Sequence, residues 1–116
     1  MKKLSEAVEM FAKQRDWDQF HSPKNLSMAL AIEAGELMEH FLWLTQAESR
    51  ELPQERVSAI GAEVGDVMIY LTRLCQVLGL DPLDEATRKL ELNEKRYPVE
   101  RARGVARKYT ELQDDE

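Results

Sequence analysis

This sequence contains two pairs of acidic residues, and the members of each pair lie three residues apart in an apolar stretch. Glu33 and Glu36 lie in the stretch EAGELMEHFLW, and Glu63 and Asp66 lie in EVGDVMIYL. Side chains at i and i+3 share one face of a helix, so each pair points in one direction. Like charges at this spacing weaken a helix, and an unpaired carboxylate is costly to bury. We therefore predict that a divalent metal ion supplies the missing positive charge.

The remainder of the sequence also indicates helices. Only five glycines and four prolines occur in 116 residues, and no window alternates strictly enough to predict a strand. The fold class is therefore predicted to be all-α, a four-helix bundle. We expect a domain over residues 1–97 and a basic, then acidic, tail over 98–116. Capping signals and hydrophobic periodicity predict four helices. The first ends before Trp17, the second runs from about 24 to 44 after a Ser22 cap, the third from about 53 to 78, and the fourth from about 83 to 96. RDWDQFHSPKN and TQAESRELP are expected to be a loop and a connector.

The second and third predicted helices resemble each other. Aligning Glu33 with Glu63 also aligns Gly35 with Gly65. Glycine inside a helix costs roughly 1 kcal/mol relative to alanine, which suggests a close approach to the backbone, most simply by the partner helix. Antiparallel packing of these helices would bring all four acids into one cluster.

The ligand set determines which metal is expected. Four carboxylates, Glu33, Glu36, Glu63 and Asp66, suit a hard cation, so we predict Mg²⁺, with Mn²⁺ as a substitute. The alternative is that these acids only line solvated helix faces. A di-iron bundle would require Glu-x-x-His on two helices, and His40 follows Leu37 at that spacing. We expect His40 to lie on a helix surface or interface.

Composition narrows the class of protein. The chain is 43% apolar and 33% charged, which is typical of a soluble globular domain, and its net charge of −6 disfavours nucleic acid as a partner. No apolar run approaches the ~20 residues of a membrane span, and the N-terminus has no secretion signal. The single cysteine, Cys75, fits a buried apolar position. We expect a cytoplasmic protein without membrane contact.

Four blocks of sequence, in order, resemble a known family. RDWDQFHSPKNL, EAGELMEHFLW, EVGDVMIYL and KLELNEKRYPVERARGVARKYTEL are similar to the MazG-like all-α nucleoside triphosphate pyrophosphohydrolases, in their dCTP pyrophosphatase branch. The resemblance implies Mg²⁺-dependent hydrolysis of the α–β phosphate bond of a (d)NTP to NMP and pyrophosphate, with dCTP or modified dCTP favoured. It also implies a homo-oligomer, a tetramer built from dimers. A dUTP-preferring or broad-range pyrophosphohydrolase, and a non-catalytic helical binding module, are the alternatives.

Two positions depart from the family pattern. Ile32 stands where many relatives carry an additional acid, and Val8 stands where some dCTP-preferring relatives carry a histidine. The metal ligands are retained, but the identity of the catalytic base is left open. We assign catalysis to Glu36, which would orient or deprotonate a water, with Glu33 as the second candidate.

The resemblance also assigns contacts to the nucleotide. A helix face at i, i+4 and i+7 would bind phosphate and sugar; on spacing alone it could equally be an exposed polar face. Aromatic residues would stack on the base, although such residues often belong to a core, and two polar residues would contact its edge. The phosphate and sugar residues are Lys89, Asn93 and Arg96, and the base residues are Trp17, His21, Asn25, Trp43 and Tyr70.

Overall fold

The structure is a computed structural model that describes residues 1–106. Its helices are α1 (Lys2–Gln14), α2 (Pro23–Glu39), α3 (Gln46–Ser49), α4 (Gln54–Leu78), α5 (Pro82–Arg96) and α6 (Val99–Ala102), with a 3-10 turn at Asp18–Phe20. The described residues contain no strand, which confirms the predicted all-α class. Residues 107–116, which include most of the predicted acidic tail, lie outside the described residues.

The chain divides into two compact units, residues 1–81 and residues 82–116. The first unit contains α1, α2, α3 and α4, and the second contains α5 and α6. The division falls inside the domain expected over residues 1–97, and that domain boundary stays a prediction. In the described residues, no helix has both the length and the apolar character needed to span a membrane.

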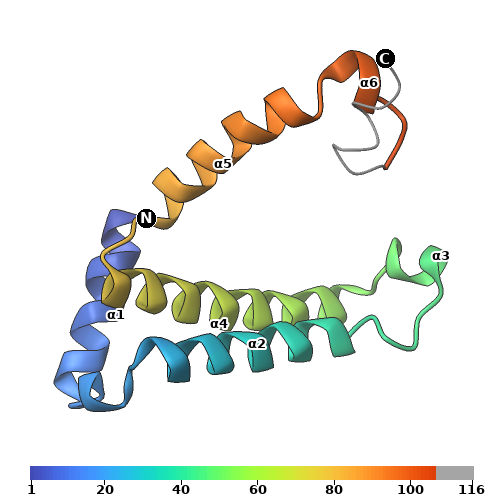
Figure 1. Cartoon of the computed structure of the whole chain (residues 1–116). Helices are drawn as coiled ribbons and strands as arrows, with labels where there is room; N and C mark the ends of the chain where they lie inside the picture. The colour runs from blue at the N-terminus through green and yellow to red at the C-terminus, as the bar shows by residue number, and fades with distance from the viewer. Residues whose placement is uncertain (107–116) are drawn as a thin grey trace. The chain divides into compact units, whose positions relative to one another are not determined.

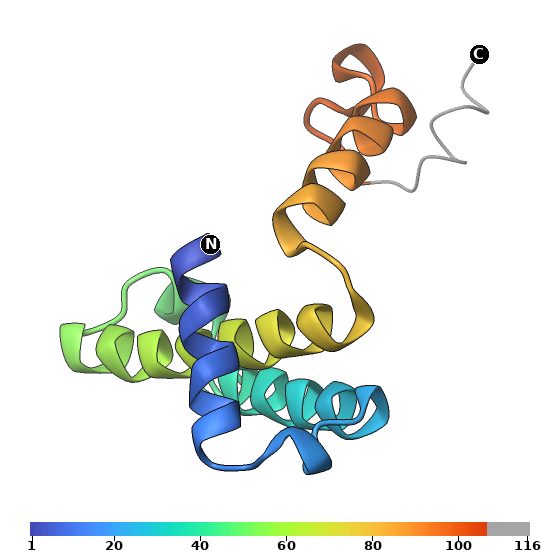
Figure 2. The ribbon, with the colours of Figure 1, turned by 90° about the vertical axis from the view of Figure 1, so that its left-hand side faces the viewer.

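The helix pair α2 and α4 forms the centre of the first unit. The two helices lie side by side along their length in both views (Figure 1 and Figure 2). They run antiparallel, because Glu36 is close to Glu63 while the charge of Asp66 acts on Glu33. The predicted antiparallel pairing is confirmed.

Local sequence signals account for several helix ends. The Ser22 hydroxyl accepts a hydrogen bond from the Asn25 amide at 3.1 Å, and Pro23 begins α2. Gly79 ends α4 in the left-handed conformation with φ of 72°, which favours a residue without a Cβ atom. Pro82 begins α5 as expected.

Two predicted segments were wrong in detail. Helix α2 ends at Glu39 rather than near Leu44, and the following residues form tight turns in which the Phe41 amide donates to the Met38 carbonyl at 2.9 Å. At this end of the helix, Arg56 Nη1 on α4 donates to the His40 carbonyl at 3.0 Å. The expected connector contains the short helix α3, which Thr45 and Glu48 open with reciprocal side-chain to backbone hydrogen bonds.

The glycines in α2 and α4 do not have the predicted cause. A Cβ atom at Gly35 or Gly65 would meet nothing within 4 Å beyond its own helix among the described residues. Close approach of the partner helix is therefore the wrong explanation, since the contact between α2 and α4 lies on other faces of both helices.

The core of the first unit is small. Its buried apolar residues are Val8, Ala12, Leu26 and Cys75, and two polar residues, Thr72 and Arg73, are buried with them. Buried Cys75 fits the apolar position predicted for it. Helix α1 contacts α4 at the end that carries Arg73 and Gln76 (Figures 1 and 2).

Candidate metal centre and adjoining pocket

Three of the four predicted metal ligands form one cluster. Glu33 and Glu36, one turn apart on α2, meet Glu63 on α4, and one carboxylate oxygen from each lies within 4.8 Å of the others. The antiparallel pairing and the i, i+3 spacing produce this arrangement together. All donors are carboxylate oxygens, so the cluster suits a hard divalent cation.

Without a bound cation, the cluster is electrostatically unfavourable because part of it is buried. Oε2 of Glu33 and Oε2 of Glu63 are inaccessible to solvent and have no hydrogen-bond partner within the described part of the chain. A buried carboxylate oxygen without a partner is costly, and a cation or a proton removes that cost. The residues present therefore fit a metal ion, because both orphaned oxygens belong to the cluster.

The pKa of Glu33 shows how strong this effect is. It is raised from 4.5 to about 7, first because burial disfavours the charged carboxylate. Glu36 and Glu63 raise the pKa further because they can accept a hydrogen bond from Glu33 once it is protonated, and the charges of Glu36 and Asp66 act in the same direction. Without a cation, Glu33 can relieve the repulsion only by taking a proton and sharing it with its neighbours.

Asp66 stands one turn beyond Glu63, outside the group of three. It is exposed, and it lines a separate pocket next to the cluster. Its charge still acts on Glu33. Asp66 therefore connects the acidic cluster to that pocket.

The pocket has a volume of about 400 Å³, and half of the residues in its walls carry an aromatic ring. Its size lies within the usual range for small-ligand sites. The Phe11 and Trp17 rings meet edge to face, with centroids 5.6 Å apart, and Trp17 and His21 do so at 6.4 Å. The lining residues are Val8, Phe11, Ala12, Trp17, Phe20, His21, Asp66, Ile69, Tyr70 and Arg73.

Three of the five predicted base-binding residues line this pocket, and two do not. Trp17, His21 and Tyr70 belong to its walls. The Asn25 side chain donates to the Phe20 carbonyl at 3.0 Å, so it braces the loop before α2. Trp43 follows α2 and is 89% exposed. Val8, which stands where some relatives carry histidine, also lines this pocket on its apolar side.

Two arginines near the cluster were not identified from the sequence. Arg73 lines the aromatic pocket and donates hydrogen bonds to Asp18 and His21, in the segment between α1 and α2. Arg56 lies in a second hollow of about 390 Å³ together with Glu36, Glu39, His40 and Glu63. Spacing could have suggested both, because Arg56, Glu63, Asp66, Tyr70 and Arg73 share one face of α4 at i, i+7, i+10, i+14 and i+17. His40 is half-buried in this hollow, and Glu39 is exposed.

The predicted phosphate and sugar residues lie on α5, in the second unit. Lys89 is exposed, whereas Asn93 and Arg96 are half-buried. Their spacing puts all three on one face of a regular helix, as predicted.

The described residues form a helical protein whose paired central helices bring carboxylates together in a candidate metal site. Comparison with known proteins narrows this class: the model of the MazG-like family matches residues 28–112. The chain belongs to the MazG-like family.

Individual relatives agree with this assignment. The chain is 45% identical over 105 residues to human dCTP pyrophosphatase 1 and 42% identical over 104 residues to the mouse protein of that name. These matches cover 88% of this chain and 61% of each relative, so the chain spans less than two thirds of their length. The crystal structure of a pyrophosphatase from Archaeoglobus fulgidus superimposes with a TM-score of 0.80 at 37% identity, covering 84% of this chain and 92% of that one.

Proposed function

We propose that this chain is a Mg²⁺-dependent nucleoside triphosphate pyrophosphohydrolase that converts dCTP, or a modified dCTP, to the monophosphate and pyrophosphate. The observation that carries the proposal is the cluster of Glu33, Glu36 and Glu63, with two buried carboxylate oxygens that need a cation, next to an aromatic pocket. The names of the human and mouse relatives support dCTP as the substrate. In this role the protein would remove unwanted nucleotides from the cellular pool, and the presence of a single cysteine, Cys75, fits a cytoplasmic location.

The four acids Glu33, Glu36, Glu63 and Asp66 would hold the metal, with Mn²⁺ as a possible replacement for Mg²⁺. When bound, the metal would neutralise phosphate charge and lower the pKa of a coordinated water. Glu36 is the exposed member of the cluster, so it can reach a water from outside. It would orient that water toward the α-phosphorus and accept its proton, while the bond between the α-phosphorus and the oxygen that bridges to the β-phosphorus breaks and pyrophosphate leaves. Glu33 is the second candidate for this role.

The aromatic pocket is suited to a nucleobase. Trp17 and Tyr70 offer faces or edges for stacking, and His21 offers a polar contact. Asp66 lines the pocket and acts electrostatically on Glu33, so a base bound there would leave its phosphates close to the acids. Contacts of Asn25 and Trp43 with the base, and of Lys89, Asn93 and Arg96 with sugar and phosphate, stay predictions.

A panel of nucleotides tests the proposal. With Mg²⁺ present, we expect pyrophosphate release from dCTP with kcat/KM clearly above the values for dUTP, dTTP, dATP and dGTP. A dominant dUTP activity or a flat profile would replace the substrate assignment but keep the chemistry. No release from any nucleotide, with nucleotide binding retained, would favour a non-catalytic binding module.

We also propose that the protein assembles with further copies of itself, as a tetramer built from dimers. Val57, Gly61, Val64 and Met68 repeat at intervals of four, three and four along α4, which is the spacing of a coiled-coil seam. The three large residues are 43%, 50% and 39% exposed, so the first unit leaves this seam partly uncovered among the described residues. A second copy of the same helix would bury it.

Light scattering after size exclusion tests the assembly. Val64→Lys should lower the molar mass relative to the wild type, because a charge in the seam cannot be buried without a partner. Glu55→Lys, on the opposite face of α4, is the matched control and should leave the mass unchanged. A monomeric wild type, or an unchanged mass for Val64→Lys, would contradict the proposed seam.

A further inference from the structure

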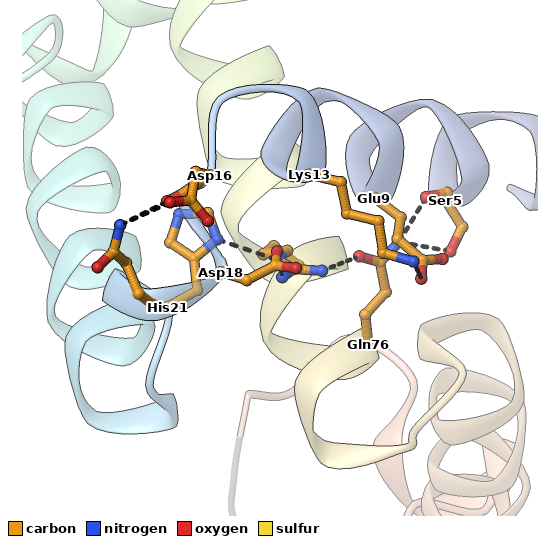
Figure 3. Close-up of polar contacts among 9 residues, drawn as sticks. Ser5, Glu9, Lys13, Asp16, Asp18, His21 and Gln76 are labelled. Carbon is orange, nitrogen blue, oxygen red and sulfur yellow. Dashed lines mark hydrogen bonds and ion pairs between the residues drawn. The ribbon is translucent and has the colours of Figure 1, made fainter.

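Arg73 is a buried charge tied to three side chains. Arg73 is 8% exposed and lies in the last third of α4. Nε donates to His21 Nδ1 at 3.0 Å, Nη2 to Asp18 Oδ1 at 2.5 Å, and Nη1 to Gln76 Oε1 at 3.0 Å. Gln76 in turn donates to the Ser5 hydroxyl at 2.8 Å and to its carbonyl. Figure 3 shows Asp18 and Gln76 lying between His21 and Ser5 along this network.

The network defines the hydrogen-bonding state of His21. A guanidinium group is always protonated and can only donate, so the bond from Arg73 Nε requires an unprotonated Nδ1 on His21. The neutral imidazole must then carry its proton on Nε2. Asp18 accepts a hydrogen bond from Nη2 of the same guanidinium, which helps to keep Nε directed at the ring.

The charge on His21 is set by the same neighbours. Burial lowers the pKa of His21 first, the Arg73 charge lowers it further, and the Asp18 charge acts in the opposite direction. Asp66 and Tyr70 are the other titratable groups on the pocket walls. His21 is therefore a neutral group whose donor and acceptor nitrogens are not interchangeable.

A fixed donor on the wall of an aromatic pocket has a consequence for base choice. Cytosine presents an unprotonated ring nitrogen, N3, which accepts a hydrogen bond, whereas uracil and thymine carry a hydrogen at N3. A histidine free to change its tautomer could satisfy either kind of base. At N3, a histidine held as the Nε2–H form can bond only to the cytosine acceptor and opposes the N3–H of uracil, and sites with fixed polar groups reject the mismatched partner strongly.

We propose that Arg73 is a positioning residue for substrate specificity: it holds His21 as a fixed Nε2–H donor, and this donor selects cytosine over uracil in the pocket. The inference rests on the proposed function for the identity of the substrate. It concerns a residue that does not itself bind the base, because all three of its bonded nitrogens are directed at His21, Asp18 and Gln76.

Kinetics of three variants test the specificity role. Arg73→Met keeps the length of the side chain but removes its donors, and we expect the dCTP to dUTP ratio of kcat/KM to fall by about tenfold or more. His21→Phe should lower the ratio to a similar value, and the double variant should be no worse than either single one, because both changes remove one interaction. Gln76→Leu is the matched control: it breaks the bonds to Arg73 and Ser5 but leaves the Arg73–His21 bond, so the ratio should stay as in the wild type.

The tautomer can be measured on the wild type alone, which avoids any loss of folding in Arg73→Met. The chain contains only two histidines, so ¹⁵N NMR of the imidazole rings should resolve His21 from His40. We expect the Nε2–H form for His21 at neutral pH, and a mixture of tautomers with a raised pKa in Arg73→Met. A wild-type His21 that is Nδ1–H or charged at pH 7 would overturn the proposal.

The outcomes separate this inference from the proposed function. Suppose that the wild type hydrolyses dCTP and that Arg73→Met keeps the wild-type ratio of dCTP to dUTP kcat/KM although its His21 is no longer fixed in the Nε2–H form. Arg73 then does not control specificity. If the wild type hydrolyses no nucleotide, the proposed function fails, and the specificity role of Arg73 fails with it even when NMR finds the Nε2–H form.

Discussion

Replacing Glu63 with glutamine is expected to lower kcat/KM for dCTP by roughly 1,000-fold, which corresponds to ~4 kcal/mol of transition-state stabilisation. Glu63 is the member of the cluster that α4 contributes, and its Oε2 is buried without a hydrogen-bond partner in the described residues. An amide has nearly the same shape as the carboxylate but lacks the charge that a divalent cation requires. The loss should therefore appear in turnover and not in the fold.

Steady-state kinetics and circular dichroism check this prediction together. The helical signal of Glu63→Gln should match that of the wild type, and its thermal midpoint without metal should be equal or higher, because one of the repelling charges is gone. Glu55→Gln, the same substitution at an exposed position in the first turn of α4, should keep full activity. Full activity in Glu63→Gln would remove this residue from the site.

The second large effect is expected in the dependence of metal binding on pH. Glu33 has a pKa raised to about 7 in the metal-free chain, so a proton must leave before the carboxylate can bind a cation. The apparent affinity for Mg²⁺ should therefore fall by about tenfold per pH unit below pH 7 and level off above it. Calorimetric titration from pH 5.5 to 8.5 would measure this slope.

The same shift fixes the sign of the stability change. The folded pKa lies above the unfolded one, so the folded chain binds more protons between about pH 4.5 and 7. Without metal, this contribution to stability is fully present below pH 4.5 and is lost as the pH rises through 7; adding Mg²⁺ should restore it on the alkaline side. Glu33→Gln removes the titrating group and should flatten both profiles. An unchanged slope in that variant would assign the proton to another residue.

The fold was predictable where local signals and helical periodicity act alone. Ser22 and Pro23 begin α2, Gly79 ends α4, and the i, i+3 acid pairs indicated that the two helices share a charged face. The early end of α2 was not predictable, because the residues after Glu39 favour a helix and a contact from Arg56 on another helix meets that end. Helix α3 was missed although Thr45 and Glu48 have the spacing of a capping box.

The candidate site was predictable in its acids and less so in its surroundings. Glu33, Glu36 and Glu63 cluster as expected, since helical spacing alone fixes their directions once the helices pair. The role of Arg73 was hidden, because its partners Asp18 and His21 are more than 50 residues away in the sequence. Trp43 was predicted to contact the base but is exposed and lies outside the pocket. Its position beside a motif did not indicate the direction of its side chain.

The central claim is that α2 and α4 hold one catalytic cation between their acids. Anomalous diffraction from crystals grown with Mn²⁺ and a non-hydrolysable α,β-imido analogue of dCTP tests it most directly. We expect an anomalous peak within coordination distance of Glu33, Glu36 and Glu63, with analogue phosphate oxygens on the same ion. Analogue bound in the aromatic pocket, with no peak among these carboxylates, would contradict it.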